Sequence, residues 1–224
     1  SANSYELIAM NKTTGQIAWR FRPKDVSVSS DPAIWGTSMC CVQATDNGKA
    51  AGTTLFMVFD TRKGEEMFRL NISQGPKPAT TYSHYASPSL SPTFNMPAPV
   101  IAGDVAFLDT LNGSVAAVNL FDRSIMWLRT YQREKSHGVA AQKGLSRPIV
   151  GPTNVLFAPS DSSQIILVNR KTGELAAKET SIKWREAAPA GKDTAVVISV
   201  NSAVFYSLAN FSAKQTVSAD NLKF

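Results

Sequence analysis

Two neighbouring cysteines are the first residues in this sequence that could carry chemistry. Cys40 and Cys41 are the only cysteines in 224 residues. This count excludes a framework of several disulfides and a zinc site built from cysteines. The simplest interpretation is two residues of a strand, one of them buried as a small hydrophobe.

Two long segments rich in basic and aromatic side chains form the second candidate. They run from Asn71 to Ala98 and from Arg129 to Arg147, and they hold both histidines. A basic surface suits an acidic protein or an anionic ligand, and loops on a rigid scaffold often carry binding. The alternative is two solvated loops that shield the edge of a sheet. The candidate binding residues are Tyr82, His84, Tyr85, Arg129, Tyr131, Arg133, Lys135, His137, Lys143 and Arg147.

Several other kinds of site are not indicated. His84 and His137 have no third ligand spaced near either of them, so we predict no metal site. The sequence has no phosphate-binding glycine loop, no nucleophile elbow and no zinc-protease helix motif, and we assign no catalytic residue. We therefore expect a protein that is not an enzyme.

Charge and hydropathy limit the classes of binding partner that we expect. The formal net charge is +6 and the sequence pI is near 9.4, which suits an acidic partner or simply reflects a basic domain. Nucleic acid is not the expected partner, because the aromatic residues do not alternate with basic ones as in stacking platforms. No apolar run reaches the roughly 18 residues of a membrane span, so we predict none.

A motif that recurs every 40 to 59 residues must position these candidates. It consists of an apolar strand, an Asn or Asp, a turn that ends four residues later, and a second strand with an apolar residue eight positions on. Asn or Asp at the start of a turn and Gly at its end are typical of hairpins. The spacing is typical of propellers, solenoids or arrays. The copies are Asn11-Gly15-Trp19, Asp60-Gly64-Phe68, Asn119-Arg123-Trp127, Asn169-Gly173-Ala177 and a weaker Ala209-Ala213-Val217.

Each later copy is preceded by a longer segment that begins with a proline, at Pro32, Pro99, Pro148 and Pro189. The similar spacing from each proline to the motif position predicts units of four strands, A to D, within a single domain over residues 1–224. The second unit is the longest, and we place its extra residues at Thr45–Thr53 between strands B and C. The predicted units are 1–22, 31–70, 98–129, 147–180 and 188–220, and the strands of the third are 99–102, 105–108, 115–118 and 125–127.

These units resemble the PQQ-like repeat of the quinoprotein alcohol dehydrogenase-like β-propellers. The resemblance rests on Asn11, Thr14-Gly15 and Trp19, on Asn169 with Thr172-Gly173, and on the blade opening 98–104. It implies an all-β fold, a β-propeller of four-stranded antiparallel blades, with about four and a half blades in this chain.

Counting strands predicts a ring that this chain does not close by itself. The first unit supplies only strands C and D, and residues 220–224 are too few to add strands A and B. Other sequence or another chain would then complete the propeller. The alternative is a small, irregular ring of five blades.

The resemblance also suggests a cofactor for the cysteines. In quinoproteins of the methanol dehydrogenase type a vicinal disulfide packs on the quinone, so Cys40 and Cys41 are candidate PQQ-binding residues. Those enzymes also hold calcium and use a catalytic Asp. Here the only acids between residues 67 and 133 are Asp104, Asp109 and Asp122, which we interpret as turn residues. We therefore expect no cofactor and keep PQQ and calcium as the alternative.

Three functions remain after this comparison. The favoured one is a non-catalytic scaffold or protein-interaction subunit that binds through a basic loop face. The alternatives are a part of a quinone- and calcium-dependent dehydrogenase, and a binder of glycans or anionic ligands. We expect a periplasmic, secreted or lumenal location, weakly favoured by Asn-X-Ser/Thr sequons at Asn11, Asn71, Asn112 and Asn210.

Overall fold

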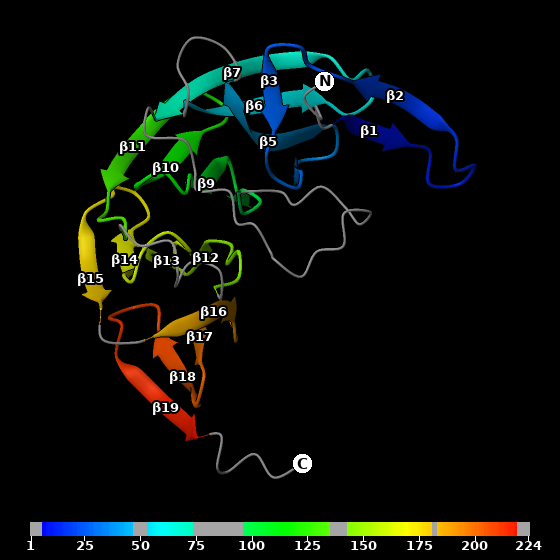
Figure 1. Ribbon diagram of the computed structural model, residues 1–224. Coiled ribbons are helices and arrows are strands. Elements are labelled where there is room, and N and C mark those ends of the chain that lie inside the picture. Colours follow the sequence, from blue (N-terminus) through cyan, green and yellow to red (C-terminus); the bar gives the residue numbers. More distant parts are fainter. Residues whose placement is uncertain (1–5, 47–52, 74–95, 135–142, 181–182, 219–224) are drawn as a thin grey trace.

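Five antiparallel sheets follow one another around an open arc (Figure 1). The computed structural model describes residues 6–46, 53–73, 96–134, 143–180 and 183–218. We call the sheets blades 1 to 5 in chain order. Blade 1 is a hairpin of β1 (Leu7–Met10) and β2 (Ile17–Phe21), as expected for a unit with strands C and D only.

Strand A is the inner strand of each four-stranded blade, and in blade 2 it is broken into two pieces. Both β3 (Val26–Val28) and β4 (Ala33–Trp35) pair with β5 (Met39–Asp46). Pro32 lies in the break and cannot donate to the ladder. The Ser30 hydroxyl accepts from the Gln43 amide there instead. The piece β3 was not predicted. The blade is completed by β6 (Thr54–Asp60) and β7 (Glu66–Ser73).

Blades 3 and 4 contain the expected four strands. In blade 3 these are β8 (Val100–Ala102), β9 (Val105–Asp109), β10 (Ser114–Asn119) and β11 (Ser124–Thr130). In blade 4 they are β12 (Ile149–Val150), β13 (Asn154–Phe157), β14 (Ile165–Asn169) and β15 (Leu175–Glu179).

Blade 5 begins earlier than predicted from the position of Pro189. Its strands are β16 (Trp184–Pro189), β17 (Thr194–Ser199), β18 (Ser202–Ser207) and β19 (Ala213–Ser218). Pro189 ends strand A instead of preceding it, because its missing N–H is tolerated at the last position of an edge strand.

The motif turn of blade 5 also differs from the prediction. In the other blades the motif side chain accepts two backbone amides, as Asn11 Oδ1 does from Thr13 and Thr14. In blade 5 the Ser207 hydroxyl accepts from Ala209, and the Phe211 amide donates to the Ser207 carbonyl. The structural copy is therefore Ser207-Phe211-Gln215, and the predicted register of Ala209, Ala213 and Val217 is wrong by two residues. Ala209 has no side-chain acceptor to close the turn.

Hydrophobic cores lie between neighbouring blades. In β6, Leu55, Met57 and Phe59 pack toward blade 1, whereas Phe56 and Val58 pack toward blade 3. Period-2 alternation therefore buries both faces of a central strand, which explains its nearly continuous apolar sequence. Equivalent cores join blade 3 to blade 4 and blade 4 to blade 5.

The antiparallel topology places the connections on two faces of the arc. Turns between strands B and C share one face with the connections from strand D to the next strand A. We call this the loop face. The motif turns between strands C and D lie on the opposite face, which we call the motif face.

Candidate functional site

The structure describes five of the ten predicted binding residues, and most of them are engaged in contacts within the chain. The five are Arg129, Tyr131, Arg133, Lys143 and Arg147. The other five, Tyr82, His84, Tyr85, Lys135 and His137, lie outside the described residues.

Tyr131 and Arg133 bind an aspartate of the next blade. The Tyr131 hydroxyl donates to Asp161 Oδ1 at 2.6 Å, and Arg133 Nε donates to Asp161 Oδ2 at 2.9 Å. Asp161 lies in the turn between strands B and C of blade 4. Both predicted residues therefore join blade 3 to blade 4 at the loop face.

Asp109 is a second carboxyl group in this cluster, and it is fully buried. Its Oδ1 accepts from the Leu111 amide at 3.1 Å and lies 3.4 Å from the Tyr131 hydroxyl. Among the described residues, Oδ2 has no hydrogen-bond donor. Burial, with the nearby Asp161 charge second, raises the pKa of Asp109 well above its usual range. Asp109 does serve its own turn, as predicted, but its burial beside another acid was not predicted.

Lys143 fixes blade 4 to blade 5. Its side chain is 4% exposed, and Nζ donates to the Ser162 carbonyl and lies 3.4 Å from Glu134 Oε2. The same ammonium group lies 5.0 Å from the centroid of the Trp184 ring. This buried cation is satisfied on three sides by its own chain.

The remaining two arginines differ in exposure. Arg129 Nη1 donates to the Gly173 carbonyl of the next blade at 3.0 Å. The Arg147 side chain is 60% exposed and lies 3.5 Å from Asp31, which lies between the two pieces of the inner strand of blade 2. Among the five described candidates, only Arg147 is exposed.

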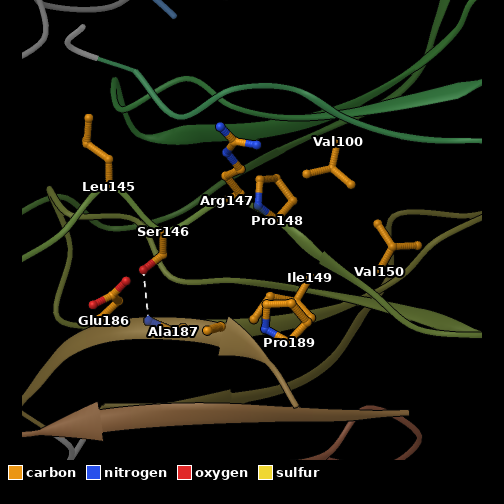
Figure 2. Close-up of a pocket in the computed structure, with 11 residues that line it drawn as sticks. Val100, Leu145, Ser146, Arg147, Pro148, Ile149, Val150, Glu186, Ala187 and Pro189 are labelled. Carbon is orange, nitrogen blue, oxygen red and sulfur yellow. Dashed lines mark hydrogen bonds between the residues drawn. The ribbon is translucent and has the colours of Figure 1, made fainter. Parts of the chain in front are cut away.

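A pocket of about 450 Å³ lies beside Arg147, where the inner strands of blades 3, 4 and 5 approach each other (Figure 2). Val100 and the Arg147 guanidinium lie at the top of the view, and Glu186, Ala187 and Pro189 at the bottom. The Ser146 hydroxyl accepts from the Ala187 amide at 2.9 Å and closes one wall.

Cys40 and Cys41 do not fit the quinone site that the resemblance suggested. They are adjacent on β5, so their side chains point to opposite faces of the sheet. Cys40 packs in the core between blades 1 and 2, and Cys41 in the core between blades 2 and 3. Both thiols are free and buried. Burial raises the pKa of Cys40 to about 11 and that of Cys41 to about 12. No single ring could lie against both.

A buried polar network between blades 2 and 3 was missed by sequence reasoning. Asn112 Nδ2 donates to Ser73 at 2.7 Å and to Thr54 at 3.0 Å, and Thr110 and Ser114 donate to its Oδ1. Nearby, Gln43 Nε2 donates to the Asp109 and Pro97 carbonyls. Asn112 was predicted only as a hairpin turn residue and a sequon. Both the nitrogen and the oxygen of its buried side-chain amide are hydrogen-bonded in this network.

Two further findings concern the described residues only. They contain no group of three His, Cys, Asp or Glu side chains placed to hold a metal ion. They also contain no helix long and apolar enough to cross a membrane.

Stacked four-stranded antiparallel sheets with cores between them define a β-propeller repeat protein, here as an arc that does not close. Residues 2–219 match the PQQ-repeat family described as outer membrane protein assembly factor BamB, and the chain belongs to that family. The predicted resemblance and fold class are confirmed.

Solved structures support the fold alone. BamB from Moraxella catarrhalis shares 13% identity at a TM-score of 0.62, over 94% of this chain and 59% of that one. A chain of a mitotic checkpoint complex shares 10% identity at a TM-score of 0.63, over 96% and 58%. Sqt1 from Saccharomyces cerevisiae shares 10% at 0.63, over 96% and 56%. The chain thus spans less than two thirds of each. No curated protein sequence matches it.

Proposed function

We propose that this protein is a non-catalytic scaffold that binds a protein partner through the loop face. The observation that carries the proposal is the anchoring of both predicted binding segments at their two ends. Before residues 135–142, the Glu134 amide donates to the Asp161 carbonyl. After them, the Gly144 amide donates to the Arg185 carbonyl. The described residues on either side of 135–142 therefore bond to blade 4 and to blade 5.

The other segment, 74–95, is anchored in the same way. Ser73 exchanges hydrogen bonds with Asn112 of blade 3. On the far side the Met96 amide donates to the Ser29 carbonyl, and the Met96 side chain is buried. Loops held at both ends by a rigid framework lose less entropy when they bind. The framework thus supports Tyr82, His84 and Tyr85 as contact residues.

Relatives give a consistent precedent. The family is described as an assembly factor, and one structural neighbour was solved within a multiprotein complex. The net charge of +6 favours an acidic partner. An extracytoplasmic location stays a prediction.

Site-specific photo-crosslinking tests this proposal. A benzophenone amino acid is placed at Tyr85 or at His137, and in a control variant at Lys171 on the motif face. In the native host, we expect a discrete protein adduct from Tyr85 and His137 and none from Lys171. Lys135→Glu should weaken the His137 adduct if the partner is acidic. Equal adducts from all three positions, or none from the loop positions, would overturn the proposal.

The two alternatives predict other outcomes. A quinone dehydrogenase would reduce a dye after addition of PQQ and calcium, and the placement of Cys40 and Cys41 leads us to expect no reduction. A binder of anionic glycans would lose affinity for heparin on Arg147→Ser. Arg133→Ser is a poor test of that idea, because Arg133 is bound to Asp161.

A further inference from the structure

A pocket of about 330 Å³ opens on the motif face between blades 2 and 3. Turns between strands A and B lie on this face together with the motif turns, because the strands of a blade alternate in direction. The pocket therefore collects side chains from around one A–B turn, from one outer strand and from one motif turn. Its apolar lining consists of Trp35, Met39, Met67, Phe68, Leu120 and Phe121.

The floor and two walls of this pocket are held by the fold. Leu120 is buried in the core between blades 2 and 3 and forms the floor. The Trp35 indole donates to Asp104 Oδ1 of blade 3 at 3.2 Å, which fixes one wall across the two blades. A β-bulge in β7 re-aims its side chains, so that the neighbouring Met67 and Phe68 line the same pocket. The pocket is thus largely preformed.

Phe121 is the exposed wall. It is 78% exposed, the highest value among the large apolar side chains in the described part of the chain. The turn holds it in this position, since the Phe121 and Asp122 amides both donate to Asn119 Oδ1 at 3.0 Å. Exposed aromatic side chains beside an apolar pocket are typical of protein interfaces, where aromatic and arginine side chains carry much of the binding energy.

Arg123 supplies a charge at the rim of the pocket. It has a φ of +54°, a conformation that is unfavourable for a residue with a long side chain, and Gly15, Gly64 and Gly173 occupy this position in blades 1, 2 and 4. Its guanidinium lies 5.6 Å from the centroid of the Phe68 ring. In the described part of the chain it pairs with no carboxylate. A strained residue that presents an unpaired cation beside an apolar pocket indicates binding.

We propose that this pocket docks a segment of an acidic protein partner, in which a large apolar side chain enters the pocket and an adjacent carboxylate pairs with Arg123. The net charge of +6 favours such a partner. A second copy of this chain would bring the same positive charge, and its Phe121 already lines its own pocket. This inference goes beyond the proposed function, since it concerns the motif face and not the loop face.

A short acidic peptide is the probe for this site. It has two central leucines flanked on each side by two aspartates, and both of its ends are capped. We would titrate it into the full chain labelled with carbon-13 at the methionine methyl groups. Of the six methionines, Met39 and Met67 line the pocket and the others serve as an internal reference. We expect saturable shifts at Met39, at Met67 and at the Trp35 indole N–H, with a Kd on the order of 0.1–1 mM, as fits a ligand with a single anchor.

Two further peptides separate the apolar contribution from the ionic one. A peptide with serine in place of the leucines should cause no shifts at Met39 and Met67. A peptide with asparagine in place of the aspartates should bind about tenfold more weakly, because it loses charge-assisted hydrogen bonds to Arg123. Added salt should weaken the acidic peptide and leave the asparagine peptide unchanged.

Three variants of the protein locate the contact. Arg123→Gly introduces the residue that the other turns carry, so it should fold as well as the parent and bind the acidic peptide about tenfold more weakly. Phe121→Ser removes an exposed ring and should also weaken binding. Lys171→Ser removes one positive charge from the exposed motif turn of blade 4 and should leave the affinity unchanged.

Three results would refute the proposal. The first is no saturable shift at Met39 and Met67, and the second is an affinity that Arg123→Gly leaves unchanged. The third is a dimer in analytical ultracentrifugation that Phe121→Ser dissociates, which would assign the surface to a second copy. A monomer whose affinity for the acidic peptide depends on Arg123 and not on Lys171 supports the proposal.

Discussion

The indole of Trp127 in blade 3 lies directly on Gly173 of blade 4, so close that a methyl group on that glycine would overlap the ring. The two residues are far apart in sequence and belong to consecutive copies of one motif. The contact combines a positive φ, a flat aromatic surface and an indole hydrogen bond. The repeat therefore encodes how neighbouring blades attach to each other as well as the hairpin of each blade.

Gly173→Ala should destabilise the fold more than Gly103→Ala. Both glycines have positive φ, for which alanine costs about 1–2 kcal/mol. Only at Gly173 must a buried tryptophan also move. Trp127→Ala alone should cost about 3–5 kcal/mol. Urea unfolding of the single and double variants checks this. The double variant should cost less than the sum, because removing the ring removes the clash; strict additivity would contradict it.

Asp109→Asn should raise stability at neutral pH and flatten its pH dependence. The folded-state pKa of Asp109 lies above its unfolded value, so the folded state binds the proton more tightly. This contribution is complete below the unfolded pKa of about 3.9 and is lost as pH rises through the folded pKa. The pKa of Asp161 is raised too, mainly by burial, while Tyr131 and Arg133 oppose that rise.

Thermal unfolding from pH 4 to pH 8 measures this effect. We expect the Tm of Asp109→Asn to exceed that of the parent by about 2–4 °C at pH 8, which corresponds to about 1 kcal/mol for a chain of this size. Asp122→Asn changes an exposed aspartate and serves as the control. If the Tm values of the parent and of Asp109→Asn changed in parallel from pH 4 to pH 8, the result would contradict a raised pKa of Asp109.

Lys143→Ala and Arg147→Ala should have very different effects on the free energy of unfolding. Lys143 is buried and donates to the Ser162 carbonyl, so its loss should cost about 2–3 kcal/mol. The Arg147–Asp31 pair is exposed on both sides, and its loss should stay within about 0.5 kcal/mol. Urea denaturation of both variants checks the difference, and equal costs would contradict the described burial.

Both cysteines should resist alkylation in the native state. Their thiols are buried, and the pKa values of about 11 and 12 leave little thiolate at neutral pH. We expect iodoacetamide to modify neither in native protein at pH 7.5 and both in urea. Mass spectrometry of the intact chain counts the adducts. Rapid native labelling, or a mass lower by two hydrogens, would contradict two buried free thiols.

Local chemistry explains why much of the fold was predictable. In blades 1 to 4, an Asn or Asp followed by a positive-φ residue four positions on closes the C–D turn, and an alternating apolar strand leads into it. In blade 3 the predicted strands agree closely with β8 to β11. The exceptions have local causes as well. Ser207 replaces Asn as the acceptor, and Pro32 and Pro189 sit in different places relative to their strands.

The candidate site was less predictable, because its contacts join different sheets. Sequence alone determined the repeat, the hairpins, the propeller fold and the segments that carry basic and aromatic residues. Only the tertiary structure decided that Tyr131 and Arg133 meet Asp161, that Lys143 is buried against Trp184, and that Cys40 and Cys41 enter separate cores. The physical reason is that a repeat period specifies each sheet through neighbours in sequence. Burial and partners at the interfaces depend on how one sheet stacks on the next.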